Sequence, residues 1–130
     1  MIAVDTNILL RLVIRDDLHQ FAVAEALLES EIFVSLTVTM ETEWVLRSKY
    51  RYSRAQIYTL MSNLLAVRSV VVEQRTLIEW VLRRYADTGD FADFIHLAGL
   101  PEGIAAFATF DKALARAAGS ESPVPVQTLS

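Results

Sequence analysis

Short apolar runs rich in β-branched residues alternate along this chain with stretches of helical periodicity, and this alternation restricts the fold more than any other feature. The clearest run is Val70–Val72, three valines in succession, which favours a buried strand. Similar runs lie at residues 2–4, 32–36 and 104–110. Such an order of elements is typical of a parallel sheet with helices on both faces. We therefore expect one α/β domain over residues 1–130.

The segments between these runs have the spacing and the end signals of helices. Apolar residues recur every three or four positions within residues 21–28, as on an amphipathic helix. Ser53 and Asp111 stand where N-caps are expected. Residues 124–126, which include Pro125, are expected to form an edge strand. A further helix is expected to begin at residue 8. The other expected helices cover residues 37–50, 55–67, 76–85, 90–100 and 112–118.

Composition excludes several classes of protein and favours a setting. The chain has no cysteine, which excludes disulfides, zinc–thiolate sites and thiol catalysis and fits a reducing cytoplasm. No uncharged apolar stretch approaches the roughly 20 residues of a membrane span, and the first residues lack the basic start of a signal peptide. The net charge of −4 argues against binding nucleic acid by general phosphate neutralisation. Divalent cations bound among converging acids would reverse the field locally.

Acidic residues follow the expected strands or begin the helices after them. In an open α/β sheet, ligands bind outside the carboxyl ends of the strands, so these side chains are expected to converge. Converging carboxylates repel one another unless cations lie among them, and their hard oxygen atoms favour Mg²⁺ or Mn²⁺. Such ions promote the hydrolysis of phosphodiesters. The residues concerned are Asp5, Glu41, Asp90, Asp93 and Asp111.

Each of these acids also has a structural interpretation. Asp5 and Asp111 are plausible N-caps, and Asp90 is an acid that the dipole of a helix favours in its first turn. Asp93 is harder to explain in this way. It lies in the apolar stretch of residues 91–97, where an unpaired acid in a mostly buried helix would be costly.

The helix over residues 37–50 offers two acids, Glu41 and Glu43, which point to nearly opposite faces. Glu43 precedes Arg47 by four residues, the favourable orientation for a solvated surface pair. Glu41 has no such partner and shares its face with Val38 and Val45. We therefore assign Glu41 to the site and Glu43 to the surface.

Other polar residues are candidates for supporting roles. Hydroxyl and amide groups next to the acids would orient the ligands or hold water, or would serve only as turn and cap residues. His96 is more simply a hydrogen-bonding helix residue than a ligand. Several arginines are candidates for contacts with phosphates. The neighbours are Thr6, Asn7, Ser35 and Thr109, and the arginines are Arg11, Arg15, Arg47 and Arg51.

The order and spacing of four motifs resemble those of the PIN-domain nucleases, and more narrowly those of the VapC-type toxins of toxin–antitoxin pairs. The motifs are Val4-Asp5-Thr6-Asn7, the segment from Glu41 to Arg47, Asp90-Phe91-Ala92-Asp93 and Thr109-Phe110-Asp111. The resemblance covers essentially the whole chain. It implies a three-layer α/β/α fold with a parallel, about five-stranded sheet. It also implies an acidic quartet, here Asp5, Glu41, Asp93 and Asp111, with Asp90 as a frequent fifth metal ligand.

The same resemblance implies a biological role. An endoribonuclease of this kind would use Mg²⁺ or Mn²⁺ and would cut single-stranded or structured RNA such as tRNA. It would form a homodimer and bind a small DNA-binding antitoxin whose C-terminal segment blocks the active-site groove. Two alternatives stay open, namely a PIN nuclease that processes RNA outside such systems and a catalytically silent interaction module.

Other phosphoryl-transfer folds fit the sequence less well. A haloacid-dehalogenase-type phosphatase needs an aspartate at the position of Asn7. A receiver domain needs an acidic pair after the first strand and a lysine after the fifth, and neither arrangement is present. The 4 glycines are scattered, which excludes a P-loop.

Overall fold

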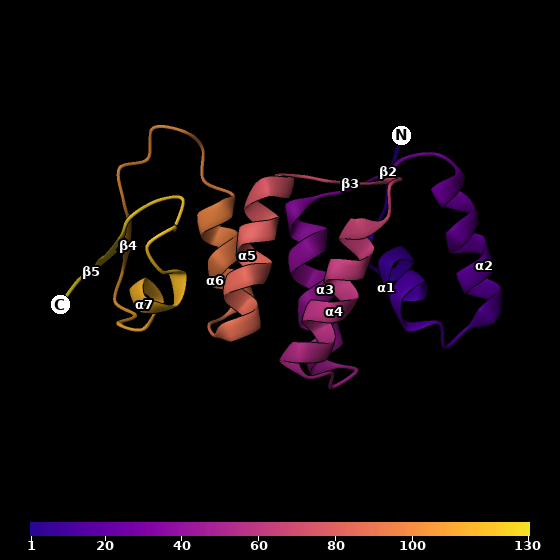
Figure 1. Ribbon diagram of the computed structural model, residues 1–130, viewed down its shortest axis with the longest axis horizontal. Coiled ribbons are helices and arrows are strands. Elements are labelled where there is room, and N and C mark those ends of the chain that lie inside the picture. Colours follow the sequence, from indigo (N-terminus) through magenta and orange to yellow (C-terminus); the bar gives the residue numbers. More distant parts are fainter. The chain divides into compact units, whose positions relative to one another are not determined.

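The computed structural model describes residues 1–130 and contains five strands and seven α-helices (Figure 1). The chain divides into two units, Met1–Arg75 (unit 1) and Thr76–Ser130 (unit 2), which are described in turn. No helix combines the length and the apolar character that crossing a membrane requires.

The sheet of unit 1 consists of three parallel strands in the order β1-β2-β3. Ile32 of the central strand lies in register with Ile2 on one side and with Val70 on the other. The two inner strands carry four buried β-branched residues, and such side chains pack well on a pleated surface. These residues are Ile32, Val34, Val70 and Val72. The strands are β1 (Ile2–Ala3), β2 (Ile32–Val34) and β3 (Val70–Val72).

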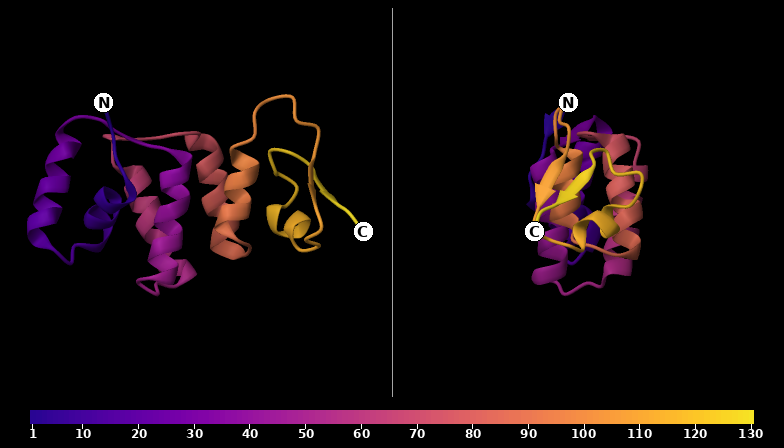
Figure 2. Two further views of the ribbon diagram at one scale, coloured as in Figure 1. Left: turned by 180° about the vertical axis from the view of Figure 1, so that it is seen from behind. Right: turned by 90° about the vertical axis from the view of Figure 1, so that its left-hand side faces the viewer.

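The helices of unit 1 begin at side-chain caps. Asp5, Asp17, Ser35 and Ser53 each accept a hydrogen bond from a backbone N–H in the first turn of the following helix. Ser53 forms a full capping box with Gln56, so its predicted capping role is confirmed. Figures 1 and 2 show α3 beside α4. The helices are α1 (Thr6–Ile14), α2 (Leu18–Ala26), the 3₁₀ turn η1 (Leu27–Glu29), α3 (Leu36–Ser48) and α4 (Arg54–Ala66).

Unit 2 combines a helix pair with a two-stranded parallel sheet. Edge-to-face contacts join α5 to α6, with ring centroids 5.7 Å apart for Trp80 and Phe94 and 5.2 Å apart for Tyr85 and Phe91. β4 and β5 lie side by side with α7 next to them (Figure 2, right). The elements are α5 (Arg75–Asp87), α6 (Phe91–Ala98), β4 (Phe107–Thr109), α7 (Leu114–Ala118) and β5 (Val126–Thr128).

The predicted α/β class with parallel strands is confirmed. The five strands form two sheets, one of three strands and one of two. The edge strand predicted at residues 124–126 lies two residues later in the structure, where β5 begins at Val126. Pro125 directly precedes β5 and has no N–H to donate. Its carbonyl accepts a 2.8 Å hydrogen bond from the Phe107 N–H. The last helix begins at Leu114, later than predicted, and its N-cap is Ala113. The predicted cap at Asp111 is therefore wrong, although its Oδ1 accepts a 2.9 Å hydrogen bond from the Ala113 N–H just before the helix.

Candidate functional site

In unit 1 the fold brings Asp5 and Glu41 to one place. Asp5 follows β1, and its Oδ1 accepts a 3.2 Å hydrogen bond from the Ile8 N–H at the start of α1. The next residue, Thr6, is buried, and its hydroxyl donates to Oε1 of Glu41 on α3. Asp5, Thr6, Asn7 and Glu41 line one hollow of about 290 Å³. Thr6 and Asn7 thus line the same hollow as these acids.

The structure corrects the prediction made for Glu43. This residue is only 2% exposed and is therefore not a surface residue. The expected partner is present, because Nε of Arg47 lies 2.8 Å from Oε2 of Glu43. Helix α3 turns Glu43 inward together with Thr42 and Leu46, and the half-exposed Arg47 compensates its charge. Glu41, not Glu43, shares the hollow with Asp5.

In unit 2 the charges of Asp90 and Asp111 act on Asp93. Asp90 is the N-cap of α6, and its Oδ1 accepts a 3.2 Å hydrogen bond from the Asp93 N–H. The pKa of Asp93 is raised, first by burial, then by the charge of Asp90, and also by that of Asp111; His96 acts in the opposite direction. The backbone N–H of Asp111 donates to the Thr109 hydroxyl at 3.0 Å. Thr109 therefore holds the backbone of Asp111.

The chemistry of these two sets of residues fits a hard divalent cation. Both sets offer carboxylate oxygen atoms, and a cation beside Asp93 would offset the repulsion that raises its pKa. No group of three or more His, Cys, Asp or Glu side chains is close enough together to hold one metal ion. The quartet has two members in each unit, so its assembly around a shared ion stays a prediction.

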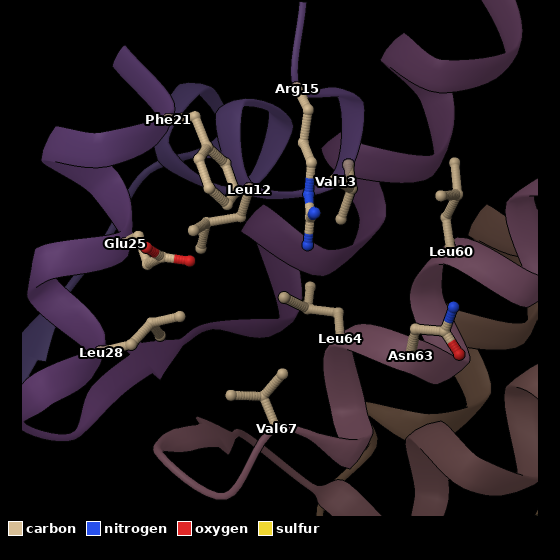
Figure 3. A pocket seen from close by; sticks show the side chains of 10 residues that line it. All are labelled: Leu12, Val13, Arg15, Phe21, Glu25, Leu28, Leu60, Asn63, Leu64 and Val67. Carbon is tan, nitrogen blue, oxygen red and sulfur yellow. The ribbon is translucent and has the colours of Figure 1, made fainter. Parts of the chain in front are cut away.

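The other candidates occupy varied positions. Ser35 caps α3, where its Oγ accepts from the Val38 N–H at 3.3 Å. Arg11 lines the hollow of Asp5 and Glu41. Arg15 lies over the Phe21 ring, 4.7 Å from its centroid, and points into a different hollow of about 410 Å³ among apolar side chains of α1, α2 and α4 (Figure 3). None of the predicted acids lines that hollow.

Three residues of unit 1 were not anticipated from the sequence, namely Lys49 and Tyr50 at this hollow and Glu73 at the start of α3. Glu73 follows β3, and its Oε1 accepts a 2.8 Å hydrogen bond from the Leu36 N–H at the start of α3. Lys49 and Tyr50, just after α3, line the hollow with Asp5 and Glu41. The position of Glu73 directly after a strand was a usable signal for an edge-of-sheet role. Nothing local distinguishes Lys49 or Tyr50.

The family model described as PIN domain matches residues 2–120 of the chain. The chain belongs to the PIN domain family. Comparisons with curated proteins and with solved structures gave no match. The matched segment includes every acid of the predicted quartet, and the helix-rich units with parallel strands agree with the three-layer α/β/α fold of a PIN domain. PIN domains are generally nucleases that use divalent metals.

Proposed function

We propose that this PIN domain is an endoribonuclease that hydrolyses RNA phosphodiester bonds with Mg²⁺ or Mn²⁺. The observation that carries the proposal is the grouping of carboxylates within each unit. Thr6 holds Glu41 beside Asp5, and the charges of Asp90 and Asp111 reach Asp93. Carboxylates that share a hollow, or whose charges act on a neighbouring acid, favour the binding of a divalent cation.

The roles of the residues follow from these contacts. A bound divalent cation neutralises charge at the phosphate and makes water a stronger acid there. The proposed metal ligands are Asp5 and Glu41 in unit 1 and Asp93 and Asp111 in unit 2, with Asp90 as a further ligand. Thr6 donates to one oxygen of Glu41 and leaves the other oxygen free to ligate. Thr109 fixes the backbone at Asp111.

Removal and return of the metal test this function. After treatment with EDTA the full chain is expected to leave a mixture of tRNA and single-stranded RNA intact, and Mg²⁺ or Mn²⁺ should restore cutting. Gel electrophoresis of the RNA gives the readout, and Mn²⁺ binding is measured in parallel by calorimetry. Undiminished cutting in EDTA would rule out metal-dependent hydrolysis. Absence of both cutting and Mn²⁺ binding would favour the silent interaction module.

We also propose that the nuclease is the toxin of a toxin–antitoxin pair, acting in the cytoplasm as a homodimer. The resemblance of the four motifs supports this role. Expression of the chain in bacterial cells should arrest growth, and co-expression of a small neighbouring reading frame should restore it. The Asp93→Asn variant serves as the matched control and should not arrest growth. RNA cleavage in vitro without growth arrest would instead favour a PIN nuclease of RNA processing.

A further inference from the structure

The hollow that contains Asp5 and Glu41 also has a cationic part. Two contacts of α1 mark the two ends of this hollow. Thr6 bonds to Glu41 within α3, and Nη2 of Arg11 donates to the hydroxyl of Tyr50, just after α3, at 3.0 Å. Both helices therefore advance in the same direction between these contacts. The hollow runs from the acids along the two helices to the side chains of Arg11, Lys49 and Tyr50.

This cationic part presents hydrogen-bond donors that have no acceptor. The Tyr50 oxygen accepts from Arg11, so its own O–H stays available to donate. Nζ of Lys49 lies 5.7 Å from the centroid of the Tyr50 ring and forms no ion pair. Arg11 is fixed in place by Asp16, whose Oδ1 lies 2.6 Å from Nη1. The Asp16 carboxylate is therefore already engaged with Arg11.

A free ammonium and a free hydroxyl select a ligand that carries negative charge and only acceptor atoms, as a phosphodiester does. Thr6 and Arg11 are five residues apart on α1, which is a rise of about 7.5 Å. With the acids at the Thr6 end of the hollow and the cationic part at the Arg11 end, the cationic part is placed to contact a neighbouring phosphate of the same strand. We propose that Lys49 and Tyr50, with Arg11, form a subsite for an RNA phosphate next to the one that is cut. This inference rests on the proposed function, because it takes RNA as the substrate.

The subsite is tested by RNA binding without cleavage. A fluorescent single-stranded oligoribonucleotide is titrated with the full chain in EDTA over a series of salt concentrations. Lys49→Gln should weaken binding about tenfold and reduce the slope of log K against log salt by about 0.7, as loss of one phosphate contact does. Tyr50→Phe should weaken binding about threefold without changing the slope. Arg68→Gln, which removes a charge at an exposed position outside the hollow, should change neither quantity.

A second measurement uses the metal-loaded enzyme. There Lys49→Gln should raise KM about tenfold with little change in kcat, because the contact is the same in the bound substrate and in the transition state. Equal affinity and slope for Lys49→Gln and the parent, an equal loss in Arg68→Gln, or no RNA binding by the parent would each overturn the subsite. RNA binding that depends on Lys49 in a chain that never cuts RNA would remove the proposed function and leave the subsite in place.

Discussion

Replacement of Asp93 by asparagine is expected to reduce metal-dependent RNA cleavage by a factor on the order of a hundred to a thousand. The substitution keeps the size of the side chain but removes the charge that a divalent cation needs. Rates of cutting under single-turnover conditions give the measurement. Asp87→Asn makes the same change at an exposed acid at the end of α5 and should leave the rate unchanged. Parental activity in Asp93→Asn would refute the site.

The same variant controls for unfolding. Since burial and two neighbouring acids raise the pKa of Asp93, the folded chain holds this proton more tightly than the unfolded chain does. The metal-free fold therefore loses stability as pH rises from the ordinary pKa of aspartate through the raised one. At neutral pH Asp93→Asn should melt at a temperature no lower than the parent, and at acid pH the two should converge. A lower melting temperature at neutral pH would contradict the assigned repulsion.

Substitution of Asp5 by asparagine distinguishes the two roles that the sequence left open for it, an N-cap and a metal ligand. Asparagine is as good an N-cap as aspartate, so Asp5→Asn should retain the bond to the Ile8 N–H that starts α1. If Asp5 acts only as a cap, cleavage should survive the substitution. If Asp5 is a metal ligand, cleavage should fall as far as in Asp93→Asn while the melting temperature stays close to that of the parent.

The features that the sequence predicted correctly are those determined by residues close together in the chain. The run Val70–Val72 coincides with β3 because three β-branched residues disfavour other structures. The cap at Ser53 depends on contacts within four residues. Helical spacing also placed Glu41 and Glu43 on opposite faces of α3. Which face of α3 is buried depends on strands and helices distant in the sequence. The pairing of Glu43 with Arg47 suggested a surface position for Glu43, but Glu43 is buried.

The cationic part of the hollow could not be predicted from the sequence, because it too depends on the packing of residues distant in the chain. Arg11 and Tyr50 meet only because α1 and α3 follow neighbouring parallel strands and pack side by side. No periodicity within either helix records that packing. The prediction that the acids converge rested on a local signal, since each acid stands close to the end of a strand or the start of a helix, where parallel α/β folds bind their ligands.

Gly89 determines the turn that leads into Asp90 and α6, and its replacement by alanine is expected to cause the largest loss of stability. Its φ is +91°, and an added Cβ would lie 2.3 Å from Cζ of Phe94 and 3.2 Å from Cβ of Ala117. Phe94 cannot withdraw easily, because it is fully buried and packs edge-to-face against Trp80. Backbone strain of about 1–2 kcal/mol is thus joined by overpacking of about 1–3 kcal/mol.

Gly103→Ala is the matched control for this substitution. Gly103 has a φ of +88°, but no heavy atom lies within 4 Å of an added Cβ. Gly103→Ala should therefore lose only the backbone contribution of about 1–2 kcal/mol. Urea unfolding of the metal-free full chain measures both variants. Equal losses would mean that Phe94 moves aside, whereas a larger loss in Gly89→Ala shows that the turn before Asp90 is held by the packing of the unit 2 core. Because Asp90 in turn binds the Asp93 N–H, that packing also positions the acids of α6.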